Sequence, residues 1–209
     1  MDSPDLFAAA RESAREMSCP PPAAPDAALL ERAARFLERG GWLRTVAGER
    51  DFREAARAFA ACSLTERKGI YVWGGFGCGK TAFVAAATRL TRLPTVTIPL
   101  ATESERLDKE EWPHFNSELL GMNVVLDDLG AEPPVCSYGV RRELAGEFIT
   151  RYHMLGRGRL FITTNLDGDA MLNQYTMRIT SRLKDLCVPL HLTGRDKRTW
   201  TKPGEGGAA

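Results

Sequence analysis

The sequence predicts an α/β fold, with a mainly parallel five-stranded sheet and helices on both of its faces. Three observations predict it. From residue 69 onward, short apolar stretches that favour strands alternate with stretches that favour helices. A glycine-rich loop joins the first of these strands to the first helix. Two later strands end in polar side chains, and parallel sheets bind their ligands at the carboxyl ends of their strands.

Length and composition limit the kinds of protein that this chain can be. Its 209 residues are enough for one α/β domain with a short appendage. The formal net charge of +1 gives no general attraction to nucleic acid, so any such binding needs a local basic patch. The five cysteines are scattered and include no C-x-x-C pair, which argues against a zinc site and a disulfide framework.

We expect neither a membrane segment nor a secretion signal. No apolar run approaches the roughly 20 residues that cross a bilayer. The acidic start of the chain, Met1 to Asp5, differs from the basic start of a secretion signal. The sequence therefore predicts a soluble, cytoplasmic protein with no membrane partner.

The first third of the chain is expected to be helical and to be divided by prolines. Residues 1–25 should hold a short helix and a proline-rich linker, because proline removes backbone donors and fixes φ. Residues 26–66 should form a short helical appendage. Asp26 is placed to cap its first helix, and a glycine pair should end that helix. The two helices are expected at 27–39 and 51–62.

Residues 67–198 are expected to form the core domain, followed by a polar, glycine-rich and flexible tail at 199–209. The expected strands of the core are 69–73, 95–98, 123–127, 159–163 and 187–191. The expected helices are 80–92, 139–155, 169–174 and 176–186.

The glycine-rich loop is a complete phosphate-binding motif of the form G-x-x-x-x-G-K-[ST], preceded by a strand and followed by a helix as the motif requires. Its glycines let backbone N–H groups surround a polyphosphate, and the helix N-terminus adds partial positive charge. Lys80 should pair with the β- and γ-phosphates of ATP, and the Thr81 hydroxyl should complete the shell of a Mg²⁺ ion. The predicted nucleotide-binding residues of the loop are Gly74, Gly75, Phe76, Gly77, Cys78, Gly79, Lys80 and Thr81.

Two aspartates follow the apolar run 123–126, where a parallel strand beside the phosphate loop ends on the γ-phosphate side. Asp127 is the expected nucleotide-binding acid on the metal side, and it should hold Mg²⁺ together with Thr81. Asp128 is expected to orient the attacking water and to accept its proton. A solvated turn is the ordinary alternative for such a pair, but the preceding phosphate loop favours catalysis.

Polar residues later in the chain complete the candidate catalytic set. Asn165 follows another apolar strand and is predicted to hold the lytic water or to contact the γ-phosphate, with Thr164 as a second choice. Arg178 and Arg182 lie four residues apart on a predicted helix and so share a face. Arginine can stabilise a transferring phosphoryl group, also from a neighbouring subunit. Both arginines could instead solvate the helix or pair with Asp185.

In this order, the segments resemble the AAA+ ATPases of the DnaC/DnaI helicase-loader and IstB transposition-helper group. The resemblance covers about residues 67–198 and leaves the N-terminal third and the tail unmatched. Many nucleoside triphosphatases share the phosphate loop, so two other sequence motifs are more specific to this group. They are Asp-Asp-Leu-Gly-Ala-Glu at 127–132 and Thr-Thr-Asn-Leu at 163–166.

The resemblance implies a P-loop AAA+ core that hydrolyses ATP with Mg²⁺ and works as a homo-oligomer, with a reduced or absent C-terminal lid. It places Asp127 and Asp128 on the second nucleotide motif and Asn165 on the first sensor. It also places Arg182 on the finger arginine that acts across a subunit boundary, with Arg178 as a second candidate.

Three functions are compatible with these motifs. The first is an ATP-dependent loader that places a replicative helicase on single-stranded DNA during DNA replication. The second is a transposition helper that assembles on duplex DNA and recruits a transposase. The third is a kinase of a small substrate, which would not need the paired arginines Arg178 and Arg182 and would need a substrate lid that the sequence does not indicate.

The distribution of charge favours the loader. Residues 1–66 contain nine arginines, no lysine and eleven acidic residues, a net charge of −2. An acidic appendage suits a protein partner better than the phosphates of duplex DNA. Five arginines of the core could form a basic strip for single-stranded DNA, or simply a solvated helix face. They are Arg141, Arg142, Arg151, Arg157 and Arg159.

Overall fold

The computed structural model describes residues 25–64, 69–89, 91, 93–103, 118–133, 135–137, 140–194 and 196. The predicted N-terminal helix with most of its proline-rich linker, and the predicted tail, lie outside these residues. Whether a C-terminal lid follows the core is likewise a question about residues that the structure does not describe.

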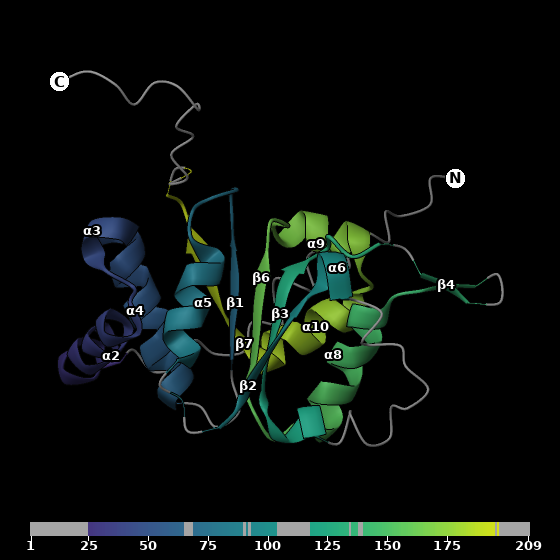
Figure 1. Ribbon diagram of the computed structural model, residues 1–209, viewed down its shortest axis with the longest axis horizontal. Helices are drawn as coiled ribbons and strands as arrows, with labels where there is room; N and C mark the ends of the chain where they lie inside the picture. The colour runs from purple at the N-terminus through teal and green to yellow at the C-terminus, as the bar shows by residue number, and fades with distance from the viewer. Residues whose placement is uncertain are drawn as a thin grey trace, which may run out of the picture.

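A parallel five-stranded sheet forms the centre of the protein, as the sequence predicts (Figure 1). The strands lie in the order β2-β3-β6-β1-β7. The strand that leads into the phosphate loop, β1, therefore lies beside β6, which ends at Thr164 and is followed by Asn165. Because all pairings are parallel, the polar ends of β1, β3 and β6 meet at one edge. The strands are β1 Gly69–Gly74, β2 Thr95–Pro99, β3 Asn123–Leu129, β6 Leu160–Thr164 and β7 Cys187–Leu192.

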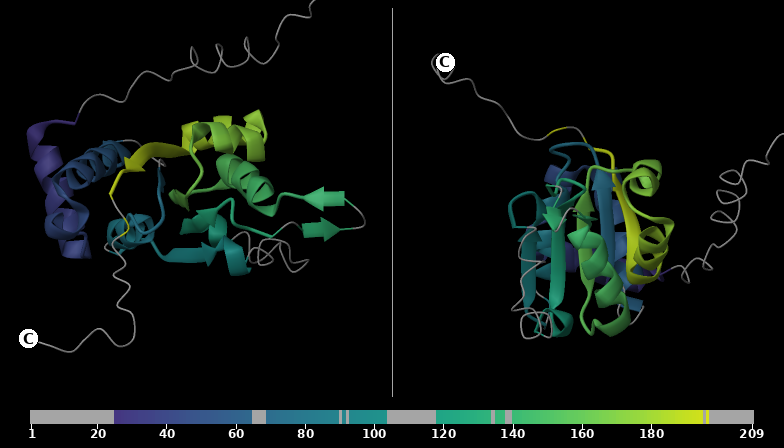
Figure 2. Two further views of the ribbon diagram at one scale, coloured as in Figure 1. Left: turned by 90° about the horizontal axis from the view of Figure 1, so that it is seen from above. Right: turned by 90° about the vertical axis from the view of Figure 1, so that its right-hand side faces the viewer.

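Helices cover both faces of the sheet and bury two hydrophobic cores (Figures 1 and 2). Along β1, Ile70 and Val72 enter the first core, while Tyr71 between them packs against the second. This alternation is what a strand produces when both faces of its sheet are covered. The first core takes α2 Ala27–Gly40, α4 Glu49–Leu64 and α5 Lys80–Thr88; the second takes α8 Leu144–Leu155, α9 Gly168–Gln174 and α10 Met177–Leu186. There are also two four-residue helices, α3 Arg44–Ala47 and α6 Leu100–Glu103, and residues 118–121 are helical as well.

The helices predicted as an appendage pack onto the sheet domain. Asp26 caps α2 by accepting a hydrogen bond of 2.7 Å from the backbone N–H of Leu29, and Gly41 ends the helix in the left-handed conformation. Gly40 lies against the backbone of Ala86 on α5, so a Cβ at this position would overlap the Ala86 carbonyl. Close helix contact therefore requires glycine here, and α2 is part of the first core.

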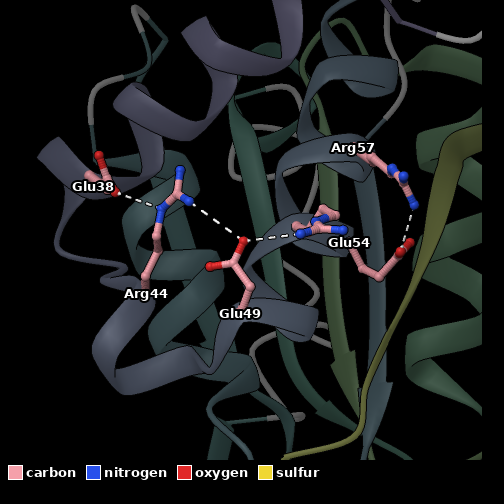
Figure 3. Close-up of polar contacts among 6 residues, drawn as sticks. Glu38, Arg44, Glu49, Glu54 and Arg57 are labelled. Carbon is pink, nitrogen blue, oxygen red and sulfur yellow. Dashed lines mark hydrogen bonds and ion pairs between the residues drawn. The ribbon is translucent and has the colours of Figure 1, made fainter. Parts of the chain in front are cut away.

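A chain of ion pairs surrounds the short helix α3 (Figure 3). Arg44 lies between Glu38 of α2 at 3.4 Å and Glu49 of α4 at 3.5 Å. These side chains are about half exposed, and such pairs contribute at most about 1 kcal/mol each. The Arg44 guanidinium also lies over the ring of Phe52, which is buried in the first core. Apolar contacts, more than the charges, fix this corner of the fold.

Two predicted helix boundaries were wrong. The helix predicted at 80–92 ends at Thr88, because the N–H and hydroxyl of Thr91 both bond to the Thr88 carbonyl and close the last turn. The helix predicted to begin at 139 begins at Leu144, after an antiparallel hairpin of β4 Val135–Ser137 and β5 Val140–Arg142. A glycine between two short valine-containing runs is a hairpin signal that the sequence reading missed.

A buried carboxylate holds the chain where it leaves β7. Asp51 of α4 accepts hydrogen bonds from the Thr193 N–H, the Thr193 hydroxyl and the Gly194 N–H, at 3.2, 2.9 and 2.8 Å. Only 4% of Asp51 is exposed. The contact ties α4 to the same edge of the sheet at which β1 enters the phosphate loop.

Replacing Asp51 by alanine should lower the free energy of unfolding by about 3 kcal/mol, because three donors lose their buried acceptor. Chemical denaturation monitored by circular dichroism would measure this change. Glu31→Ala, which removes an exposed ion pair with Arg35, is the control and should cost less than about 0.5 kcal/mol. Equal stabilities of the two variants would contradict the role given to Asp51.

Candidate functional site

The phosphate loop runs from the end of β1 to the start of α5 and has the backbone that the motif requires. Gly74, Gly77 and Gly79 have φ angles of 153°, 68° and 102°, a region that side chains other than glycine rarely adopt. Gly79 directly precedes α5, so the unbonded N–H groups of the first helical turn lie at the loop. This arrangement of a glycine-rich turn and a helix N-terminus binds anions.

Lys80 is a buried cation at the base of the loop. Its side-chain nitrogen, Nζ, donates to the carbonyl oxygens of Gly74 at 2.9 Å and Gly75 at 2.8 Å, and to Asn165 Oδ1 at 2.7 Å. Lys80 is 7% exposed. Within the described part of the chain, no carboxylate lies within ion-pair distance of it. All three donors are satisfied by neutral oxygens, so the charge itself has no counter-ion.

Asp127 lies beside the loop, as the sequence predicts. Its Oδ1 accepts hydrogen bonds from Thr81 Oγ1 at 3.0 Å and from Thr163 Oγ1 at 2.5 Å. Thr81 is the second residue of α5, Asp127 is near the end of β3, and Thr163 is on β6. Three elements of the sheet domain therefore meet at one carboxylate oxygen.

A β-bulge places the two aspartates at the end of β3. The pairing with β6 shifts by one residue between Leu126 and Leu129, so that Asp127 and Asp128 together face Thr163. Asp128 has a positive φ of 59°, the only such value among the described residues other than glycine. Its N–H donates to Thr163 Oγ1 at 2.9 Å in place of a ladder bond. The Thr163 hydroxyl thus bonds to both aspartates and stabilises the bulge.

The Asp128 carboxylate is half-buried and receives no hydrogen bond from the described residues. A carboxylate held in this way is available to accept a proton from water. Strained backbone at such a residue is common in active sites, where it aims a side chain. The geometry is therefore compatible with the role in water activation that the sequence predicts for Asp128.

The structure separates the two candidate finger arginines. Arg182 is half-buried, and its Nη1 donates to Thr150 Oγ1 of α8 at 2.7 Å. Arg178, in the first turn of α10, is exposed. Within the described residues, no hydrogen bond or ion pair joins either arginine to the phosphate loop of its own chain. A role in catalysis for either one stays a prediction that needs a second subunit.

Other loop residues differ in their surroundings. Phe76 is 71% exposed at the tip of the loop, whereas Cys78 is fully buried beneath it. A Cβ at Gly77 would overlap the Asp196 carboxylate, so the chain beyond β7 returns to the loop. Burial of the Cys78 thiol protects it from thiol reagents in the folded protein.

Thr163 is a site residue that sequence reasoning missed. The prediction chose Asn165 and, second, Thr164, whose hydroxyl bonds to the Leu129 carbonyl at 2.6 Å and accepts from the Leu166 N–H at 3.0 Å. A signal was present, because two hydroxyl residues in succession at the end of a buried strand must place one on each face. The bulge opposite Thr163 could not be found from spacing alone.

The basic strip predicted for single-stranded DNA is not continuous. Arg142 forms an ion pair of 2.5 Å with Glu147, and Arg159 donates to the backbone oxygen and the thiol sulfur of Cys62 in α4. Arg151 and Arg157 are exposed. The predicted strip is interrupted because the Arg159 side chain points toward Cys62 of the first core. The position of Arg159 just before β6 does not show this direction in the sequence.

The residues present fit a nucleoside triphosphate with its metal ion. Lys80 supplies a buried positive charge that has no carboxylate partner among the described residues, and the loop and α5 supply backbone donors. Thr81 and Asp127, joined by a hydrogen bond of 3.0 Å, supply the hydroxyl and carboxylate oxygens that Mg²⁺ prefers. The site is thus a P-loop nucleotide site at the carboxyl edge of a parallel sheet.

No family model and no curated protein matches this chain. Among solved structures, it is similar to crystal structures of NtrX from Brucella abortus in complex with ATP and with ADP, each 15% identical, with TM-scores of 0.45 and 0.44. The match covers 89% and 90% of this chain but only 42% and 41% of the NtrX chains. The likeness is too slight to support conclusions about function, which rest on the site itself. Among the described helices, none combines the length and apolar content that a membrane crossing needs.

Lys80→Ala should abolish ATP binding, because the loop loses the cation that neutralises the terminal phosphates. Titration with a fluorescent ATP analogue would measure the affinity. Lys184→Ala, on the exposed side of α10, is the matched control and should bind like the wild type. Submicromolar binding by Lys80→Ala would refute the assignment of the phosphate loop.

Thr163→Val keeps the shape of the side chain but removes the hydroxyl that holds both aspartates. We expect kcat for ATP hydrolysis to fall by about 10- to 100-fold, as for residues that orient a metal ligand. The affinity for ATP should change little, because Lys80 and the loop are untouched. Steady-state kinetics and binding titrations together would test this separation, and an unchanged kcat would exclude a role for the hydroxyl.

Proposed function

We propose that this protein is a Mg²⁺-dependent ATPase that, as an ATP-controlled oligomer, loads a replicative helicase onto single-stranded DNA. The observation that carries the ATPase part is the buried cation Lys80, which lies next to the pair Thr81 and Asp127 and whose partners among the described residues are neutral oxygens. A triphosphate would supply the missing negative charge.

The residues divide the chemistry among themselves. Mg²⁺ held by Thr81 and Asp127 would neutralise charge on the β- and γ-phosphates. Lys80 would exchange its bonds to backbone carbonyls for phosphate oxygens and keep its contact with Asn165, which then marks the γ-phosphate side. Asp128 would accept the proton of the attacking water, from the position that the bulge and Thr163 give it.

An arginine from a neighbouring subunit would complete this site. The sequence favours Arg182, but its guanidinium bonds to Thr150 within its own chain. Arg178 lies exposed at the start of the same helix and can reach a neighbour without breaking that bond. We therefore propose Arg178 as the arginine that acts across the subunit boundary. Arg182, on the same helix, would hold that helix against α8 through its hydrogen bond to Thr150.

The loader role is supported by the surface of the N-terminal helices. Along α2, α3 and α4, arginines pair with glutamates, as in Arg35 with Glu31. Figure 3 shows the pair of Arg57 with Glu54. Pairing leaves these arginines less able to neutralise the phosphates of duplex DNA. A protein partner such as a helicase fits this mixed surface better than a duplex, on which the alternative role as a transposition helper depends.

Subunit mixing tests the arginine. Asp128→Asn should bind ATP but not hydrolyse it, and Arg178→Ala should do the same. Mixing the two should restore hydrolysis, because a site with an intact Asp128 then meets a neighbour with an intact Arg178. Arg182→Ala mixed with Asp128→Asn is the parallel arm. Rescue in that arm alone would reassign the finger to Arg182, and rescue in neither would contradict an arginine acting in trans.

A loading assay tests the partner. The protein, ATP and a purified hexameric helicase from the native host are combined with circular single-stranded DNA coated by single-strand-binding protein. We expect unwinding to depend on this protein and on ATP, and to be lost with Lys80→Ala. Binding to duplex DNA together with a transposase, without helicase stimulation, would contradict the loader and support the transposition helper.

A further inference from the structure

Hydrogen bonds join the turn after β3 to the end of α9, and α10, which carries Arg178, begins two residues after Tyr175. We propose that Glu132 and Tyr175 are positioning residues that couple the conformation of the Asp128 bulge to the placement of Arg178. This inference rests on the proposed ATPase function and adds two residues to it that touch neither the phosphate loop nor the aspartates.

Glu132 connects two segments through its two carboxylate oxygens. Oε2 accepts a hydrogen bond of 2.7 Å from the backbone N–H of Gly130, in the turn that directly follows β3. Oε1 accepts a hydrogen bond from the hydroxyl group of Tyr175, at the end of α9. Each oxygen has a separate task, so a side chain with a single acceptor oxygen cannot perform both.

The turn at Gly130 is held from several sides. Its carbonyl accepts from Gln174 Nε2 at 3.0 Å, and the preceding Leu129 carbonyl accepts from Thr164 Oγ1 at 2.6 Å. Gly130 has a φ of 97°, and a Cβ there would overlap the side chain of Leu166. The turn cannot move without moving α9 or the loop after β6, and it begins two residues after the strained Asp128.

Tyr175 carries this constraint to α10. It is 3% exposed and ends α9, while α10 begins two residues later at Met177, which places Arg178 in the first turn. Burial, and next the hydrogen bond to Glu132, raise the pKa of Tyr175 far above its usual value, so its hydroxyl stays a donor. A buried hydroxyl needs its acceptor, and losing it costs free energy.

These contacts form one continuous path from Asp128 through Gly130, Glu132 and Tyr175 to Arg178. A change in the bulge that accompanies ATP hydrolysis would shift the turn, and the turn would shift the start of α10. In an oligomer, the state of the nucleotide site in one subunit would then change the position of its Arg178. That change would alter the site of the neighbouring subunit at which this arginine acts.

The test uses Tyr175→Phe, which removes only the hydroxyl, and Glu132→Gln, which keeps the shape but leaves a single acceptor oxygen. For both variants we expect kcat for ATP hydrolysis to fall by about tenfold while the affinity for ATP is unchanged. The double variant Tyr175→Phe/Arg178→Lys should be no slower than Arg178→Lys alone, which keeps a positive charge and a measurable rate, because the hydroxyl acts through the arginine.

Tyr152→Phe is the matched control. Tyr152 is 1% exposed and donates to the Met122 carbonyl at 2.7 Å. Met122 directly precedes β3, so this bond lies at the opposite end of that strand from the two aspartates. This variant should lose similar stability in urea but keep its kcat. An equal fall of kcat in Tyr152→Phe, or a further fall in the double variant, would overturn the positioning role.

The experiment also separates this inference from the proposed function. A wild-type protein that does not hydrolyse ATP, alone or with DNA, would refute the ATPase and the coupling together. A wild-type protein that hydrolyses ATP and whose kcat is unaffected by Tyr175→Phe would refute the coupling alone.

Discussion

The buried charge of Lys80 is the constraint on which the site depends. A buried ammonium group is costly when, as in the described part of this chain, no carboxylate pairs with it. The fold reduces that cost with the carbonyl oxygens of Gly74 and Gly75 and the amide oxygen of Asn165. Those oxygens come from the end of β1 and from the residue after β6, two neighbouring strands of a parallel sheet. The sheet order thus creates the contact, and the contact leaves a positive charge suited to an anion.

The bulge at the end of β3 has a matching role on the acidic side. A regular strand would send Asp127 and Asp128 to opposite faces of the sheet. One extra residue opposite Thr163 instead lets a single hydroxyl bond to both, and Asp127 then also meets Thr81 at the start of α5. The turn that follows is fixed by Glu132, Gln174 and Tyr175, so the same distortion that aims the acids also anchors α9 and α10.

Much of this could be predicted from the sequence. All five strands of the sheet were located because their apolar runs are bounded by clear turns, and the phosphate loop, with its lysine, has a fixed spacing. The meeting of Thr81 with Asp127 followed from parallel strands ending at one edge. Local patterns determine these features, and local patterns are what a sequence shows.

The remainder depends on tertiary contacts. The hairpin at 135–142 replaced a predicted helix start, and the role of Thr163 arose from a register shift that only pairing with β3 creates. Arg182 and Arg159 were read as surface residues, yet one bonds to Thr150 and the other to Cys62, on elements distant in sequence. The partners of long side chains depend on which residues lie nearby in the folded protein, and spacing along the chain does not show this.

The most direct measurement of the central claim is a crystal structure with Mg²⁺ and a non-hydrolysable ATP analogue. The account predicts phosphate oxygens within hydrogen-bond distance of Lys80 Nζ, and the metal ion between Thr81 and Asp127. An analogue bound elsewhere, with Lys80 still bonded to Gly74 and Gly75, would contradict it.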